Sequence, residues 1–401
     1  MNSFRIPFNK PSLSGNELLH VAESIRAGHI SADGRFTKRC RELLEAEFAV
    51  PGVLLATSCT HALEMAALLM NICPGDEVIV PSFTFVSTVN AFVLRGAVPK
   101  FVDVRPDTLN MDESLIEPLI TARTKAVVPV HYAGVGCEMD TIISLAKGHQ
   151  IAVIEDNAHG VFGRYRGKHL GTFGSLATLS FHETKNLTCG EGGALVVNDD
   201  NLLERAEFIR DKGTNRKRFF RGQVDKYTWV DVGSSYGLSD ILAAYLYAQL
   251  EKREEIQLGR KRLWHQYYVS LNDWAANHNV QLPFVPAHCE QAYHMFYMLL
   301  PSLEIRQALI DHLKARGILS VFHYLPLHLS DMGKRNGGRL GQCPVCEDVS
   351  NRLLRLPFYN SLSEAEQMDV VHAIESFEFP RAMVDRETAR PITVARATYS
   401  D

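Results

Sequence analysis

Four short segments of this chain place chemically active side chains directly after apolar runs. They are residues 57–60, 81–85, 151–159 and 179–186. Open α/β sheets bind ligands in the loops at the carboxyl ends of their strands, so these segments are predicted to share one edge of a sheet. Taken singly, each also fits an ordinary role: a helix cap, core packing, a strand-ending turn or a surface lysine.

The first two segments suit a flat, phosphorylated ligand. Thr57-Ser58-Cys59-Thr60 supplies small hydroxyl side chains before a helical pattern. Such residues cap a helix, and the free N–H groups of its first turn can hold a phosphate. In Pro81-Ser82-Phe83-Thr84-Phe85, an aromatic ring could lie over a planar group.

The other two segments supply an acid and an amine. The apolar run at 151–154 leads into Glu155 and Asp156, and a buried carboxylate there could keep a heterocyclic nitrogen protonated. Lys185 follows another apolar run and precedes the glycine-rich stretch 190–193. Desolvation lowers the pKa of a lysine and makes its amine nucleophilic, as Schiff-base chemistry requires. A phosphate-holding helix start, an aromatic ring, an acid and a lysine, in this order, predict pyridoxal phosphate (PLP).

Apolar strands alternating with helical stretches must position these residues. Strands are expected at 53–56, 78–80, 98–102, 126–130, 151–154, 177–181 and 194–197, with an amphipathic helix at 60–72. Near-continuous apolar strands indicate a mostly parallel sheet covered on both faces, hence an α/β fold. A helical stretch at 236–274, strands near 295–300 and 319–324, and helices at 303–316 and after 363 indicate a smaller α/β unit. We therefore predict a large domain at 1–250, whose N-terminal segment is free to pack elsewhere, a small domain at 251–380 and a loose tail at 381–401.

Composition excludes several classes of protein. The chain of 401 residues has 42 Lys and Arg against 46 Asp and Glu, a net charge of −4, which disfavours a nucleic-acid binder. No apolar run is long enough to span a bilayer, and the N-terminus lacks a secretory core, so we expect a cytoplasmic protein. Cys343-Pro344-Val345-Cys346 has no second pair to complete a four-ligand zinc site, so no metal is predicted. A dinucleotide-binding dehydrogenase would need G-x-G-x-x-G after the first strand, which is absent.

From about residue 6 to about residue 380, the chain resembles the DegT-like nucleotide-sugar aminotransferases, which are fold-type I PLP enzymes. In Ser180-Phe181-His182-Glu183-Thr184-Lys185-Asn186, Lys185 matches the Schiff-base lysine of the family. Asp156 matches the partner of the pyridine nitrogen, and His159 the position beside the phenolic oxygen of the cofactor. The resemblance further implies that the phosphate is bound by Cys59, Thr60 and Ser180. It also implies that the ring of Phe85 stacks on the cofactor.

The resemblance also implies a homodimer in which the segment Gly233-Ser234-Ser235-Tyr236 completes the neighbouring site. Ser235 would contact the phosphate there, where many members carry Asn. His323, Tyr324 and His328 resemble a segment near the sugar, with a core histidine as the alternative for His323. Basic residues between 212 and 226, including Arg216 and Lys226, could bind the diphosphate of a sugar nucleotide or simply be solvated.

Residues 58–60, 101–108, 129–135, 212–216 and 221–229 resemble family members that aminate C4 of dTDP-4-keto-6-deoxyglucose with glutamate as donor. Another nucleotide-linked ketosugar remains an alternative. A dehydratase of the family would carry histidine in place of Lys185. A non-catalytic cofactor-binding regulator usually carries a DNA-binding module, which we do not expect before residue 10 or after residue 380.

Overall fold

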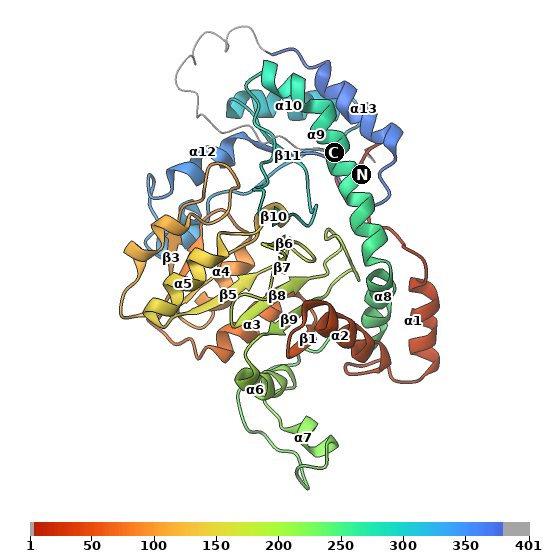
Figure 1. The fold of residues 1–401 in the computed structure, drawn as a ribbon, viewed down its shortest axis with the longest axis vertical. Coiled ribbons are helices and arrows are strands. Elements are labelled where there is room, and N and C mark those ends of the chain that lie inside the picture. The colour runs from red at the N-terminus through yellow and green to blue at the C-terminus, as the bar shows by residue number, and fades with distance from the viewer. Residues whose placement is uncertain (1–3, 380–401) are drawn as a thin grey trace.

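The structure, a computed structural model, describes residues 4–379 and is built around a seven-stranded sheet (Figure 1). Its strand order is β1-β9-β8-β5-β4-β2-β3. Only β9 is reversed, running antiparallel to β1 and β8, so the other strands all end at one edge of the sheet. The strands are β1 (Gly52–Ala56), β2 (Glu77–Pro81), β3 (Val98–Val102), β4 (Thr124–Val127), β5 (Ala152–Asp156), β8 (Leu176–Ser180) and β9 (Gly193–Val197).

Helices cover both faces of the central sheet, which confirms the predicted fold class. In β1, Val53 and Leu55 belong to a core cluster with α2 and α8, whereas Leu54 and Ala56 belong to another with α3, α4 and α6. Successive side chains of a strand point to opposite faces, so a sheet buried on both sides needs strands without polar alternation. These helices are α2 (Arg35–Phe48), α3 (Cys59–Leu69), α4 (Val86–Val93), α6 (Asp200–Arg210) and α8 (Asp240–Glu251).

A smaller antiparallel sheet, of order β11-β13-β12, lies with its helices at the top of Figure 1. The N-terminal segment joins this part of the molecule, because buried Ile6 forms a bridge with Ile318. The division into domains at residue 250 stays a prediction. The elements here are β11 (Tyr297–Leu299), β12 (Val321–Phe322), β13 (Leu353–Arg355), α9 (Arg253–Asn277), α10 (Leu303–Ala315), α12 (Pro344–Arg352) and α13 (Glu364–Glu375).

The long helical stretch expected at 236–274 is two helices, α8 and α9, which meet at Lys252. The expected start at residue 236 is wrong. Residues 235 and 237 form bridges with Asp211 and Ala56 instead, and Ser239 caps α8 by accepting a hydrogen bond from the N–H of Leu242. The predicted tail at 381–401 lies outside the described residues.

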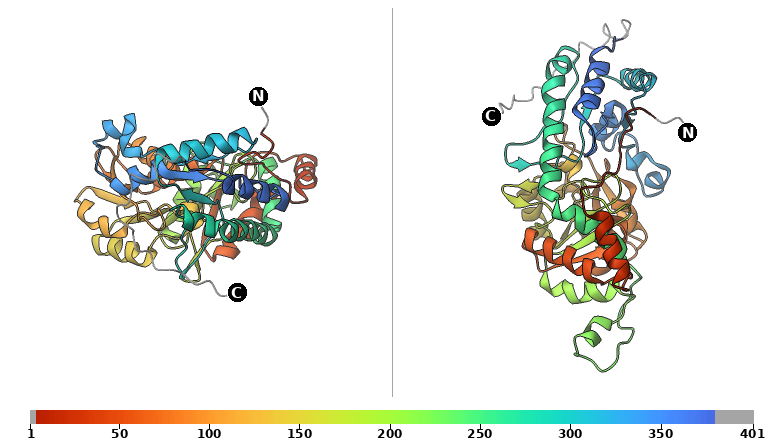
Figure 2. Two further views of the ribbon diagram at one scale, coloured as in Figure 1. Left: turned by 90° about the horizontal axis from the view of Figure 1, so that it is seen from above. Right: turned by 90° about the vertical axis from the view of Figure 1, so that its right-hand side faces the viewer.

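The remaining elements are short. Within residues 4–379, no helix is both long and apolar enough to cross a membrane. A side view shows α9 and α13 at one end of the molecule and the segment that carries α7 projecting from the other (Figure 2, right). The short elements are α1 (Glu17–Arg26), α5 (Met139–His149), α7 (Arg216–Phe220), α11 (Asp331–Arg335), β6 (Arg164–Tyr165), β7 (Lys168–His169), β10 (Cys289–Glu290) and four 3-10 turns, Glu113–Leu115, Glu117–Leu119, Tyr132–Gly134 and Leu327–Leu329.

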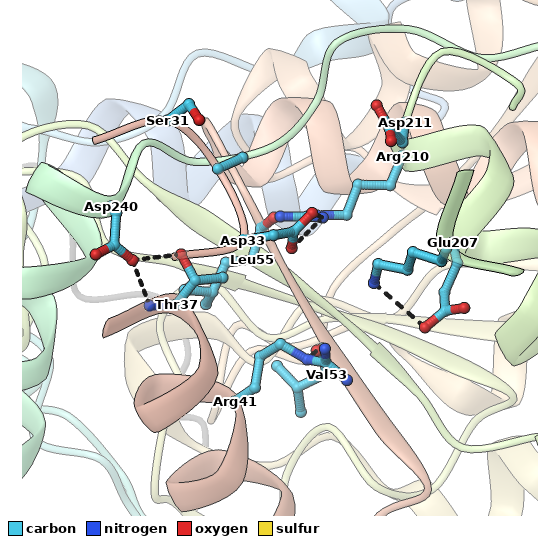
Figure 3. Close-up of polar contacts among 12 residues, drawn as sticks. Ser31, Asp33, Thr37, Arg41, Val53, Leu55, Glu207, Arg210, Asp211 and Asp240 are labelled. Atoms are coloured by element: carbon cyan, nitrogen blue, oxygen red, sulfur yellow. Dashed lines mark hydrogen bonds and ion pairs between the residues drawn. The ribbon is translucent and has the colours of Figure 1, made fainter. Parts of the chain in front are cut away.

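Two buried side chains fix the loop before α2 and the first turn of that helix: Asp240 at the start of α8 and Arg210 at the end of α6 (Figure 3). Asp240 accepts hydrogen bonds from the backbone N–H and the hydroxyl of Thr37, at 2.8 and 3.0 Å. Arg210 donates to Asp33 at 2.9 Å and to the carbonyl of Leu55 at 2.7 Å. Arg210 thereby links the loop before α2 to β1, whereas Asp240 links the start of α2 to α8.

Candidate active site

A cavity of about 400 Å³ lies at the carboxyl edge of the central sheet. It brings together residues from all four segments singled out in the sequence. The C-terminal part of the chain closes it with His294, His323, Tyr324 and Arg355. The residues of this chain expected at the cofactor all line the cavity: Cys59, Thr60, Phe85, Asp156, His159, Ser180 and Lys185.

One end of the cavity is formed by the start of α3. Ser58 caps this helix, its hydroxyl accepting a hydrogen bond from the N–H of His61 at 3.1 Å. The N–H groups of the first turn have no partners within a helix, and they suit an anion. Gly193 lies against this turn so closely that a Cβ there would be 2.3 Å from the backbone nitrogen of Cys59. Only glycine therefore lets β9 begin at this point.

Asp156 ends β5 and is almost fully buried. Burial raises the pKa of its carboxyl group, whereas hydrogen bonds from Thr88 and Ala158 and the charge of Lys185 oppose that rise. The Thr88 hydroxyl donates at 2.7 Å, and the N–H of Ala158 donates at 3.2 Å. Because Thr88 donates to the carboxylate, it must accept from the hydroxyl of Thr84, which lies 2.8 Å away. This chain of hydroxyl groups orients the carboxylate.

Lys185 lies in the turn that follows β8, where its N–H donates to the carbonyl of His182 at 2.9 Å. Desolvation lowers the pKa of its amine to about 8, although nearby Cys59 and Asp156 favour the charged form. A lysine with such a pKa can be an uncharged nucleophile, and a proton donor or acceptor, close to neutral pH.

Uncharged aromatic side chains form another part of the cavity lining. Burial lowers the pKa of His159, His294 and His323 well below the usual value, so these rings are neutral. His159 and His294 are stacked, with 4.3 Å between the ring centroids. His323 Nδ1 lies 3.0 Å from the hydroxyl of Tyr132. Phe85 is 56% exposed, so its ring is free to contact a ligand.

Four residues proposed from the sequence lie away from the lining of this cavity. His328 is fully buried between the hydroxyl of Ser82 at 2.6 Å and Glu347 at 3.0 Å. Its ring therefore holds the Leu327–Leu329 turn to the end of β2. The other three are exposed, two of them in the projecting segment around α7: Arg216, Lys226 and Ser235.

Arg355, Thr88 and His294 line the cavity but were missed in the sequence. The first had a signal, since Arg355 is a lone charge between apolar residues at 353–354 and 356. No hydrogen bond or ion pair to its guanidinium is found in residues 4–379, and its Nε is buried. Thr88 and His294 carried no comparable signal.

Cys343 and Cys346 pack in the core at the start of α12, and burial raises the pKa of the Cys343 thiol to about 12. No cluster of three or more His, Cys, Asp or Glu side chains able to hold a metal occurs in the described part of the chain.

The profile of the DegT/DnrJ/EryC1/StrS aminotransferase family matches residues 11–375. The chain belongs to this family. A relative, an uncharacterized protein of Methanocaldococcus jannaschii, is 33% identical over 380 residues, covering 93% of this chain and 97% of its own. The resemblance noted in the sequence is thus confirmed.

Solved structures of the family are similar throughout. Spr1654 of Streptococcus pneumoniae, described as a sugar aminotransferase, superposes with a TM-score of 0.86 and 26% identity, covering 93% of this chain and 97% of the other. It has been solved in PLP and PMP forms. DesV of S. venezuelae is 30% identical with a TM-score of 0.83, covering 93% and 98%. The present chain is a PLP-dependent aminotransferase of this family.

The side chains in the cavity fit this cofactor. The N-terminus of α3 suits its phosphate, and buried Asp156 lies ready for a protonated ring nitrogen. His159 lines the same cavity, where its neutral ring can contact the cofactor. Lys185 supplies the amine that the cofactor requires.

Proposed function

We propose that this aminotransferase moves an amino group from L-glutamate to C4 of dTDP-4-keto-6-deoxy-D-glucose, giving dTDP-4-amino-4,6-dideoxy-D-galactose. The observation that carries the aminotransferase chemistry is that Lys185 and Asp156 line one cavity with the start of α3, whose free N–H groups suit a phosphate. Likeness to family members at residues 58–60, 101–108, 129–135, 212–216 and 221–229 supports the substrate.

The roles of the side chains follow from their surroundings. PLP, when bound, supplies the electron sink that stabilises negative charge beside the transferred nitrogen. Asp156 would hold the ring nitrogen in its protonated form through a charge-assisted hydrogen bond, and the Thr88 hydroxyl, which donates to Asp156, would keep the carboxylate ionised and in place. Lys185 would hold the cofactor through Nζ, and its amine, with a pKa of about 8, could accept and return a proton at the reacting carbon. Ser180 and Thr60, which line the same cavity, would contact the phosphate.

Arg355 supports a carboxylate-bearing amino donor such as glutamate. Its guanidinium reaches the cavity, stacks over the Phe8 ring at 4.6 Å and has no acidic partner in the described chain. Burial without a counter-ion lowers the pKa of Arg355 and is unfavourable for the guanidinium. An incoming carboxylate would relieve that cost through two parallel hydrogen bonds.

We also propose that the enzyme is a homodimer whose sites are completed across the interface. Ser235 is exposed and lies outside the cavity of its own chain, which leaves it free to reach a neighbouring one. The projecting segment around α7 presents Phe220 (69% exposed) and Trp229 (77% exposed), as an interface does. Arg216 and Lys226 on the same segment would meet the diphosphate, and His323 and Tyr324 the sugar.

We further propose that the protein works in the cytoplasm, in polysaccharide biosynthesis leading to enterobacterial common antigen, as its resemblance to these family members implies. Amination at C3, or a 4-amino product of gluco configuration, is the alternative within the same chemistry.

Incubation of the purified protein with PLP, glutamate and a panel of dTDP-ketosugars, followed by NMR of the products, tests this proposal. We expect the 4-keto sugar to give the galacto amine. Turnover of a 3-keto sugar alone would overturn the position of amination. No turnover of any ketosugar, with PLP bound, would instead support the non-catalytic regulator.

Dimerisation is tested separately by mixing two inactive variants, Lys185→Ala and Ser235→Arg. If the sites are shared between subunits, activity should return in the mixture.

A further inference from the structure

His294 is a cavity residue to which the proposed reaction gives no role. It lies between β10 and β11, and its carbonyl accepts a hydrogen bond of 2.6 Å from buried Arg260, which fixes the backbone. The ring is stacked on His159 and lines the same cavity as Lys185.

The protonation of the His294 ring is set by its neighbour Asn186. The amide nitrogen of Asn186 donates to the carbonyl of Ala292 at 2.6 Å and to Gln257 at 3.2 Å. Its amide oxygen must therefore be the atom that faces His294 Nδ1, at 2.9 Å. An amide oxygen only accepts hydrogen bonds, so Nδ1 carries the proton and donates.

The other ring nitrogen is consequently an acceptor. Burial and the nearby charges of Lys185 and Arg260 keep the ring neutral by lowering its pKa. A neutral imidazole protonated on Nδ1 has a lone pair on Nε2. No residue of the described chain forms a hydrogen bond to this nitrogen, and it is not among the fully enclosed unpartnered atoms. His294 thus presents an uncharged acceptor to the cavity.

We propose that His294 is a substrate-binding residue whose Nε2 accepts a hydrogen bond from a hydroxyl group of the sugar. The groups suited to phosphate and carboxylate, the start of α3 and Arg355, are cationic or donate hydrogen bonds. A lone pair would repel such anions, whereas a sugar ring brings O–H donors. This role rests on the proposed ketosugar substrate and adds to it a residue that selects sugars by a hydroxyl.

Two substitutions separate binding from support of the fold. His294→Asn can keep a donor near Nδ1 for Asn186 but removes the acceptor. His294→Gln can place an acceptor near Nε2 but loses the bond to Asn186. We expect His294→Asn to retain the bound-cofactor absorbance and the glutamate half-reaction, while kcat/KM for the ketosugar falls about tenfold. His294→Gln should retain more of this activity than His294→Asn.

A panel of monodeoxy ketosugars identifies the hydroxyl. On the analogue that lacks the hydroxyl bound by His294, kcat/KM of the wild type should fall about tenfold. On the same analogue, kcat/KM of His294→Asn should not fall further, because the variant has already lost the hydrogen bond that the analogue cannot form. Three results would overturn the proposal. The first is that His294→Asn loses the same factor in kcat/KM on every analogue, and the second is that its kcat/KM for the ketosugar stays within twofold of wild type. The third is that His294→Gln loses more kcat/KM than His294→Asn. If His294→Asn does not fold, the analogue panel is run with His294→Gln. Because this variant keeps an acceptor near Nε2, its kcat/KM should still fall about tenfold on the same analogue as the wild type. A wild type inactive on all ketosugars would overturn the proposed function itself.

Discussion

Replacing Thr88 by valine tests how the carboxylate of Asp156 is kept in its working state. The substitution preserves side-chain shape and removes the hydroxyl that donates to Asp156 at 2.7 Å in a fully buried position. A hydrogen bond to a charged group contributes about 1.5–3 kcal/mol. At about 1.4 kcal/mol per factor of ten in rate, the expected loss in kcat is about tenfold to a hundredfold.

The loss should also depend on pH, and its sign follows from the charge. The Thr88 hydrogen bond opposes the effect of burial and lowers the pKa of Asp156, so its removal raises that pKa. The ionised carboxylate is the working form. The variant should therefore lose most activity at the acidic end of the pH range and recover part of it as the pH rises.

The assay is kcat measured as a function of pH, with the absorbance of the bound cofactor followed in parallel. Thr88→Ser keeps the hydroxyl and should therefore have kcat and bound-cofactor absorbance close to those of the wild type. Thr84→Val is the graded comparison: Thr84 contacts Thr88 but not Asp156, so its loss should weaken the chain of hydroxyl groups and lower kcat less than Thr88→Val does. A Thr88→Val enzyme with wild-type kcat and an unshifted profile would refute the argument that this hydroxyl maintains the carboxylate.

Four further predictions concern three other side chains. Lys185→Ala should abolish transamination and the visible absorbance of the lysine-bound cofactor, and full turnover by this variant would disprove its role. Because the folded pKa of Lys185 is lowered to about 8 from an ordinary 10.5, folding penalises its charge below about pH 8 and ceases to do so above 10.5. Without cofactor, the Lys185→Met variant should therefore have a higher unfolding free energy than the wild type at pH 7. Urea titrations should show this difference shrinking between pH 8 and 10.5, and a difference that stays constant with pH would contradict the reasoning. Arg355→Leu should raise the KM for glutamate at least tenfold, and Arg355→Lys should raise it less. An unchanged KM in Arg355→Leu would exclude the carboxylate contact. Asp240→Ala should lower the unfolding free energy by about 3 kcal/mol, because buried donors lose their acceptor; exposed Asp225→Ala is the control, and equal effects would argue against this account.

Much of the fold could be predicted because its signals are local. Apolar strands without alternation indicated a sheet buried on both faces, and β1 shows why, with its side chains divided between two core clusters. The helix expected at 236–274 failed at its start, because residues 235 and 237 form bridges with Asp211 and Ala56, far away in sequence. Propensity within a segment does not contain such competition from distant backbone.

For the site, the sequence by itself determined the chemistry, since Asp156, Ser180 and Lys185 each lie at or just beyond a strand end. In a sheet whose strands run the same way, that position alone brings them to one edge. Tertiary structure decided the rest. It brought Arg355, His294 and Thr88 into the cavity and turned His328 into the core between Ser82 and Glu347. The physical reason is that these contacts join residues far apart along the chain, and strand register and helix packing fix their partners, not the residues beside them.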